Sequence, residues 1–250
     1  MKNKINIHFT DKCNYSCKYC FICKSSRELS IDEIKTIVDK IPVDYRINLA
    51  GGEPLCSKNI QEIIDYIYAK GHEVSLITNG SLLTEEFIKH NEDKLSMIGI
   101  SIDSLSKSKN IEIGRCCYNK AITNERVIEL CQLLKKYNIR SKINICISKF
   151  NIDEDFYPFL VSANPDCIKF LRVLNYEEVN KMKYDITDEE WKQTIEKYSK
   201  LPNSKFEDND YMENSYIIID SAGNLTKDNQ HSISNSLLKY SFEECFKKIK

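Results

Sequence analysis

Six short apolar runs, each followed by a stretch with helical spacing, constrain the fold of this 250-residue chain more than any other feature. The six predicted strands are Lys4–Phe9, Arg46–Ala50, Val74–Thr78, Met97–Ile102, Lys142–Ile147 and Cys167–Val173. Strands that alternate with helices pair in parallel and are covered by those helices. The pattern therefore predicts an α/β fold, a partial (β/α)6 barrel, with its site at the C-terminal strand ends.

The segments between the strands carry helix signals. Ser30-Ile31-Asp32-Glu33 is a capping box that opens a helix to about Lys40. Further helices are predicted over about 58–70, from residue 84, over about 120–137 and over about 155–161, with a long polar loop after the fourth strand.

The alternation ends near residue 173, which predicts two parts: a barrel over residues 1–173 and a C-terminal α+β extension over 174–250 that covers the barrel mouth. The extension holds a predicted helix over 187–200 and a β-like run, Ser215–Asp220. The polar segment Lys205–Asp210 is predicted to be a linker.

Composition excludes several classes of partner. Lys and Arg total 36 against 37 for Asp and Glu, so no excess charge indicates nucleic acid or a membrane surface. The 11 cysteines follow no disulfide framework, and Met1–Ile5 enters a strand with no signal peptide. These observations predict a cytoplasmic protein, without a membrane span, and we expect a monomer.

Polar residues share one face of most predicted strands. Asn6 and His8 lie on one face of the first strand, whereas Ile5 and Ile7 lie on the other. The same division occurs with Arg46, Asn48 and Ala50, with Gly99, Ser101 and Asp103, and with Lys142, Asn144 and Cys146. In a parallel barrel these polar faces point into the lumen, which predicts a polar, charged ligand there. The alternative is an antiparallel sheet with one solvated face.

Three cysteines, Cys13, Cys17 and Cys20, follow the first strand at a CxxxCxxC spacing. Three thiolates from one loop can hold three irons of a cubane and leave the fourth iron open, whereas structural zinc requires four ligands. The alternatives are a zinc site completed by Cys23, or three reduced cysteines that are close by chance.

Two more motifs stand at corresponding strand ends, namely Gly51-Gly52-Glu53-Pro54 and Asn79-Gly80. With the cysteine loop, they resemble the radical S-adenosylmethionine (SAM) superfamily. The resemblance implies that Cys13, Cys17 and Cys20 bind a 4Fe-4S cluster whose open iron is chelated by SAM. It implies that Tyr19 lies against the adenine of SAM and that Gly51, Gly52 and Glu53 hold its methionine amine. Ser101 and Arg115 would contact the ribose and the carboxylate. Asn79 completes the predicted cofactor-binding set.

Less generic elements resemble the viperin-like branch: Ile113-Gly114-Arg115, Lys142-Ile143-Asn144 and Met212-Glu213-Asn214-Ser215-Tyr216. The resemblance implies conversion of a ribonucleoside triphosphate (CTP, or UTP or GTP) to its 3′-deoxy-3′,4′-didehydro form, an antiviral chain terminator. A 5′-deoxyadenosyl radical would remove the C4′ hydrogen. Loss of the 3′ hydroxyl as water, with one electron and a proton, completes the product. An external donor of the flavodoxin or ferredoxin type would supply electrons.

Residues of the predicted lumen suit such a substrate. Lys142 and Lys169, each near the end of a strand, offer charges for a triphosphate, and Arg46 adds a fork of donors. The full predicted substrate-binding set is Asn6, Arg46, Asn48, Lys142, Asn144 and Lys169. By resemblance, Tyr216 takes part in the last transfer.

Some positions depart from the branch. Arg46 stands where relatives often have lysine, Ala50 where they often have serine, and Cys167 where they carry a basic residue. The competing interpretation is a radical SAM enzyme for a peptide or another small molecule, which would not need Lys142 and Lys169 in the lumen.

Overall fold

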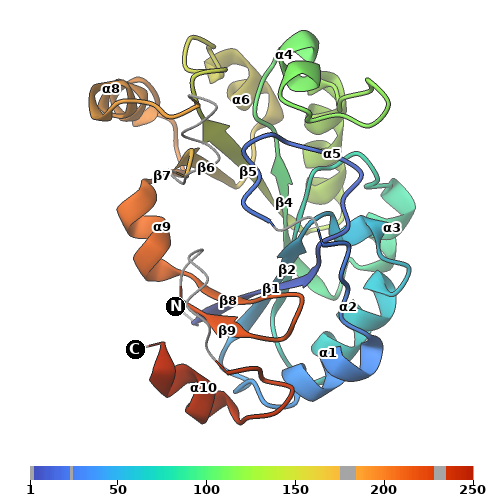
Figure 1. Cartoon of the computed structure of the whole chain (residues 1–250). Coiled ribbons are helices and arrows are strands. Elements are labelled where there is room, and N and C mark those ends of the chain that lie inside the picture. The colour runs from blue at the N-terminus through green and yellow to red at the C-terminus, as the bar shows by residue number, and fades with distance from the viewer. Residues whose placement is uncertain (1–2, 23–24, 175–183, 228–234, 250) are drawn as a thin grey trace.

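The computed structural model describes residues 3–22, 25–174, 184–227 and 235–249, and in this part of the chain the strands form one curved sheet (Figure 1). The strands are β1 Lys4–Thr10, β2 Arg46–Gly51, β3 Val74–Thr78, β4 Leu95–Ser101, β5 Arg140–Ile147, β6 Cys167–Arg172, β7 Ser204–Glu207, β8 Ile217–Ile219 and β9 Leu225–Thr226. Their order is β7-β6-β5-β4-β3-β2-β1-β8-β9.

Every neighbouring pair is parallel except β8 and β9, which are antiparallel. The predicted parallel barrel is thus confirmed, and the antiparallel alternative is wrong for the six predicted strands. The register places like residues side by side, with Asn6 opposite Asn48 and Asn144 opposite Lys169.

Helices follow the strands and cover the outer face of the sheet (Figure 1). They are α1 Ile31–Val38, the 3-10 turn η1 Pro54–Cys56, α2 Ile60–Ala69, α3 Glu85–His90, α4 Lys107–Glu112, α5 Asn124–Lys136, α6 Tyr157–Ala163, α8 Asp188–Tyr198, α9 Asn209–Ser215 and α10 Phe242–Lys248. The predicted capping box at Ser30 and Glu33 is present at the start of α1.

The core lies between the helices and the outer face of the sheet. Ile5, Ile7 and Phe9 of β1 are completely buried in it, as are Ile143 and Ile145 of β5. Each such side chain contributes about 1.5–3 kcal/mol by leaving water. This packing fixes which face of every strand points inward, and it leaves the predicted polar faces lining the lumen.

The C-terminal residues complete the same sheet at both of its edges. β7 pairs with β6, whereas β8 pairs with β1, and α9 connects β7 to β8 (Figure 1). The prediction of a linker over Lys205–Asp210 is therefore wrong, because residues 204–207 form β7 and Asp208 caps α9. The strand-like run begins at Ile217 and not at Ser215, which ends α9.

Two other boundaries differ from the prediction. The expected polar loop after β4 contains α4, whose N-cap Ser106 accepts a hydrogen bond from the backbone of Lys109. The helix expected from about Lys120 begins at Asn124, because the side chain of Thr123 caps its first turn.

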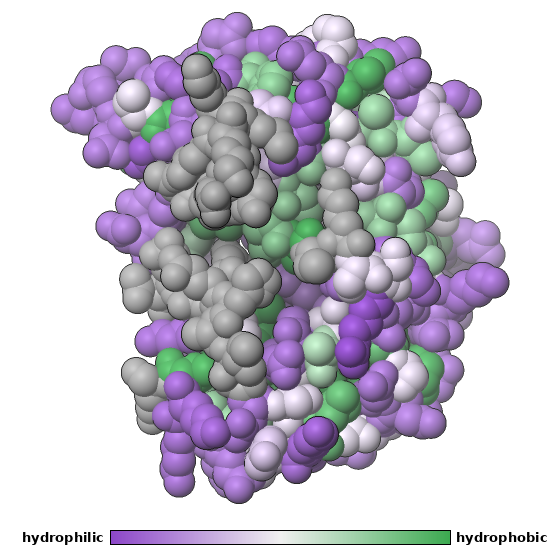
Figure 2. Space-filling model, in the orientation of Figure 1, coloured by the Kyte–Doolittle hydropathy of each residue, from purple (hydrophilic) through white to green (hydrophobic). Residues whose placement is uncertain are grey.

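Hydrophilic residues dominate the rim of the molecule in the orientation of Figure 1, and hydrophobic residues are visible toward its middle (Figure 2). Within the described ranges, we find no helix with both the length and the apolar character needed to cross a bilayer.

Candidate active site

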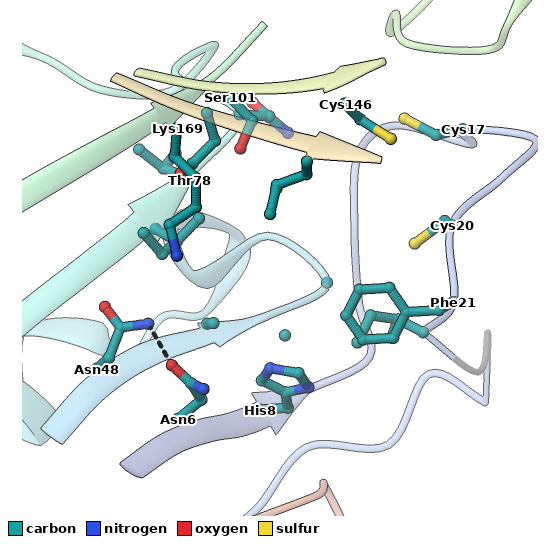
Figure 3. A pocket seen from close by; sticks show the side chains of 18 of the residues that line it. Asn6, His8, Cys17, Cys20, Phe21, Asn48, Thr78, Ser101, Cys146 and Lys169 are labelled. Atoms are coloured by element: carbon teal, nitrogen blue, oxygen red, sulfur yellow. Dashed lines mark hydrogen bonds between the residues drawn. The ribbon is translucent and has the colours of Figure 1, made fainter. Parts of the chain in front are cut away.

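One cavity of about 320 Å³ occupies the inside of the sheet. Its lining includes the cysteine loop at the C-terminal end of β1 and the inward residues of β1 through β6 (Figure 3). It also includes apolar side chains, namely Ile77, Met97, Leu171 and Ile218, so the lumen is less uniformly polar than the strand pattern indicates.

The cysteine loop is held by its backbone. The amides of Ser16 and Lys18 donate to the carbonyls of Gly114 and Ile113, at 2.9 Å each. Gly114 has φ +77°, and a Cβ on it would lie 2.3 Å from the Ser16 carbonyl oxygen. Only glycine therefore lets the segment after α4 approach the loop this closely.

The thiols of Cys13, Cys17 and Cys20 line the cavity, and none of them is in a disulfide. Three thiols on one loop fit a 4Fe-4S cluster with an open iron. In the described part of the chain, no three His, Cys, Asp or Glu side chains are grouped closely enough to hold a single metal ion. Cys23, the fourth ligand of the zinc alternative, lies outside the described residues.

The Gly51-Gly52-Glu53 turn packs against the exit of β1. The amides of Gly52 and Glu53 donate to the carbonyls of Thr10 and Lys12, at 2.7 and 2.8 Å. A Cβ on Gly51 would lie 2.4 Å from the Thr10 carbonyl oxygen, and one on Gly52 would lie 2.2 Å from that of Lys12. The two glycines thus join the second strand to the cysteine loop.

The Glu53 carboxylate faces β3. It accepts hydrogen bonds from the Thr78 hydroxyl and the Asn79 amide, both at 2.6 Å, and from the Leu55 amide at 3.1 Å. Burial raises the pKa of Glu53, although these hydrogen bonds oppose the shift. Glu53 is absent from the cavity lining, which contains Gly51, Gly52 and Asn79. In the structure, the Glu53 side chain therefore connects the end of β2 to the end of β3 by hydrogen bonds.

Arg115 and Tyr19 meet at Asp103 beside the cysteines. The Tyr19 hydroxyl donates to Asp103 Oδ2 at 2.8 Å, and Arg115 Nη1 lies 2.8 Å from the same oxygen. Arg115 also donates to the Ser101 carbonyl at 2.7 Å and approaches Cys17 Sγ at 3.6 Å. The structure thus brings together the predicted residues Tyr19, Ser101 and Arg115. Asp103, predicted only to face the lumen, contacts both Tyr19 and Arg115.

The inward-facing asparagines of β1 and β2 form hydrogen bonds within the protein. Asn48 donates to Asn6 at 2.9 Å (Figure 3), and Ser75 donates to Asn48 at 2.8 Å. Asn48 thus has hydrogen bonds at both its nitrogen and its oxygen, whereas Asn6 has one at its oxygen, and the predicted roles of both in substrate binding stay predictions. Asn144 differs, because its buried Oδ1 has no hydrogen-bond partner in the structure. Asn144 also lines the cavity, and its role in substrate binding stays a prediction.

Lys142 and Lys169 are the third residues of β5 and β6. They therefore lie further inside the barrel than the strand ends at which they were predicted. Arg46 lies at the first position of β2, 3.5 Å from Glu73. Burial, together with the nearby Lys169 and Lys4, lowers the pKa of Lys142 to about 7. The floor of the cavity, away from the cysteines, is thus lined by four basic side chains, namely Lys4, Arg46, Lys142 and Lys169.

Sequence reasoning missed Glu207, a buried carboxylate that is absent from the cavity lining but contacts two residues of it, Lys169 and Tyr216. Lys169 forms an ion pair with it and donates to the Tyr216 hydroxyl at 2.9 Å, while that hydroxyl donates to Glu207. Burial and the Glu207 charge raise the pKa of Tyr216, so the phenol stays protonated at neutral pH. Residues 204–207, Ser-Lys-Phe-Glu, do not alternate between apolar and polar side chains, so the sequence carried no signal for this strand.

Known proteins resemble this chain over nearly all of its length. A family model described as the Radical SAM superfamily matches residues 7–161. A protein of Selenomonas ruminantium named S-adenosylmethionine-dependent nucleotide dehydratase is 30% identical in an alignment of 261 positions that covers 98% of this chain and 94% of that protein. The chain belongs to the S-adenosylmethionine-dependent nucleotide dehydratases of the radical SAM superfamily.

A second S-adenosylmethionine-dependent nucleotide dehydratase, from Lacinutrix mariniflava, is 31% identical over 97% of this chain, which spans 54% of that protein. The solved structure described as native anSMEcpe with bound AdoMet has a TM-score of 0.75 at 18% identity, covering 97% of this chain and 80% of that one. The likeness to this solved structure concerns the fold alone, and it confirms the predicted radical SAM barrel. Membership of the superfamily confirms SAM and the 4Fe-4S cluster as the predicted cofactors.

The contact at Gly114 generates a prediction. Gly114→Ala should lower cluster incorporation, because its Cβ would displace the Ser16 carbonyl and the cysteine loop. Gly71→Ala is the matched control, since Gly71 has φ +84° but its Cβ would meet only the Val43 side chain, at 3.4 Å. Iron and sulfide per chain after anaerobic reconstitution measure the effect. Equal iron content in the two variants would contradict it.

The buried ion pair between Lys169 and Glu207 generates a second prediction. Glu207→Gln should lower the free energy of unfolding by about 3–5 kcal/mol, because it leaves the Lys169 ammonium buried and without its carboxylate. The double variant Lys169→Met/Glu207→Leu should lose less. Glu129→Gln, which breaks an exposed pair with Arg126, should cost less than about 1 kcal/mol. Denaturant titration measures all three, and a loss for Glu207→Gln no larger than the control would refute the pairing.

Proposed function

We propose that this protein dehydrates a ribonucleoside triphosphate (CTP, UTP or GTP) to the 3′-deoxy-3′,4′-didehydro nucleotide, an antiviral chain terminator. The observation that carries the proposal is that one cavity is lined by the three cysteines at one end and by basic side chains at the other. A radical source and a polyanion site in one chamber fit a nucleoside triphosphate better than a peptide or a neutral molecule.

When bound, the cluster and SAM supply a 5′-deoxyadenosyl radical. Cys13, Cys17 and Cys20 would hold the cluster, and the Gly51-Gly52 backbone, Tyr19 and Arg115 would line the SAM site. The Arg115 guanidinium already pairs with Asp103, so that pair fixes its position before any ligand arrives.

The substrate would lie between that end and the floor. Lys142 and Lys169, with Arg46, would bind its phosphates, while Asn144 Oδ1 would accept a hydrogen bond from the ribose. Asn6 and Asn48 would line the nucleotide pocket. This orientation directs the sugar toward the cysteines, where hydrogen abstraction takes place.

Tyr216 is proposed to take part in the final transfer of a proton and an electron. Its hydroxyl is held between Lys169 and Glu207, and its pKa is raised, so it carries a proton to give. The overall change removes one water from the nucleotide. An external one-electron donor of the flavodoxin or ferredoxin type, acting in the cytoplasm, completes the proposal.

Incubation of the reconstituted, reduced protein with SAM and each ribonucleoside triphosphate in turn tests the function. We expect 5′-deoxyadenosine and a product lighter by one water with at least one nucleotide, detected by mass spectrometry. Lys142→Met should lower kcat/KM for that nucleotide about tenfold or more, whereas Lys89→Met, which removes an exposed lysine of α3, should leave it unchanged. If none of the nucleotides stimulates 5′-deoxyadenosine formation, the proposal fails.

Triphosphate binding should weaken as the pH rises from about 7 to 9. Lys142, with its pKa lowered to about 7, is partly neutral in the empty cavity, and a bound polyanion restores its charge. Binding is therefore coupled to proton uptake. Calorimetry at pH 7.5 in buffers with different ionisation enthalpies measures that uptake, and Lys142→Met should reduce it. If the wild type and Lys142→Met take up the same number of protons, a group other than Lys142 binds the proton and the prediction is wrong.

A further inference from the structure

We infer that Lys4, the first residue of β1, is a ligand for the distal phosphates of the substrate, an inference that rests on the proposed function. Lys4 lines the cavity beside the other floor cations, and neither its position in the sequence nor the family motifs single it out.

The placement of Lys4 follows from strand register. Lys4 is opposite Arg46 in the β1–β2 pair, at the N-terminal ends of both strands. A strand rises about 3.3 Å per residue, so the seven residues of β1 separate Lys4 from the cysteine loop by roughly 20 Å. A nucleotide with its sugar near the cysteines would extend its phosphate chain toward Lys4.

The charge of Lys4 is not compensated by an ion pair in the described part of the chain, where Glu207 pairs with Lys169 and Glu73 with Arg46. Burial and the neighbouring Lys169 lower the pKa of Lys4 to about 8, against the attraction of Glu207. The empty cavity thus disfavours this ammonium, and an anion bound beside it would reverse the balance.

Lys4 also lies on Tyr216. Its Nζ is 4.8 Å from the centre of the tyrosine ring, and Lys169 Nζ is 5.4 Å from the same centre. Such cation–π contacts orient the ammonium groups. A phosphate that binds Lys4 and Lys169 together would consequently rest against Tyr216, which connects the polyphosphate subsite to the residue proposed for the last transfer.

The test is calorimetric binding to the reconstituted protein with SAM, using inorganic tripolyphosphate, each ribonucleoside triphosphate and the matching monophosphates. Lys4→Met should weaken tripolyphosphate and triphosphate binding about 10- to 100-fold, the usual range for a charged hydrogen bond, and should change monophosphate binding less than about threefold. Lys4→Arg should restore most of the affinity.

Lys205→Met is the matched control, because Lys205 is exposed on β7, is close enough to act on Lys4 electrostatically, and is not in the cavity lining. It should change neither affinity. Without ligand, Lys4→Met should melt at the same temperature as the wild type or higher, since it removes a half-buried charge whose pKa is lowered. Weaker binding by this variant would then not result from a folding defect.

The outcomes separate the two claims. A wild type that binds triphosphates while Lys4→Met binds them equally well would overturn the assignment of Lys4 alone. Equal weakening of monophosphates and triphosphates would also overturn it, because Lys4 would then act only by supporting Tyr216. A wild type that binds neither tripolyphosphate nor any nucleotide would overturn the proposed function.

Discussion

Burial of the outer face of the sheet against the helices is the interaction on which the rest of this structure depends. Residues such as Ile7 and Ile145 are completely enclosed there, so a shift of one residue in any strand would expose them. That penalty fixes the inward direction of the intervening residues. The polar lumen is therefore a result of packing on the other side of the sheet, and it stays open because its side chains are held by their strands.

Much of this could be predicted from the sequence, because periodicity is a local property. Alternation along β1 and β5 indicated which faces are apolar, and the glycines at residues 51 and 52 indicated the turn that joins the strand ends. Helix boundaries were less accurate, since a side-chain cap such as Thr123 decides them by one hydrogen bond.

The missed residues share a physical reason. Glu207 lies on a strand of four residues whose membership in the sheet depends on pairing with β6, and no pattern within the strand reveals that partner. Asp103 was predicted to face the lumen, but its partners were not, because only folding brings it to Tyr19 and Arg115. Lys4 precedes the apolar pattern of β1, where a lysine is ordinarily solvated. Depth in the barrel also escaped prediction, because register relative to other strands sets it.

The position of β8 beside β1 has a consequence for the order in which the site is assembled. The cysteine loop and the glycine turn become neighbours as soon as β1 pairs with β2, two strands that are close in the chain. The floor requires β8, which must reach the other edge of β1 from the C-terminal part of the chain and bring Tyr216 over Lys4. Contacts between segments so distant in sequence close slowly. During synthesis, the half of the cavity around the cysteines can therefore form before the C-terminal strand β8 is made. The half with the basic side chains is completed only after β8 has paired with β1.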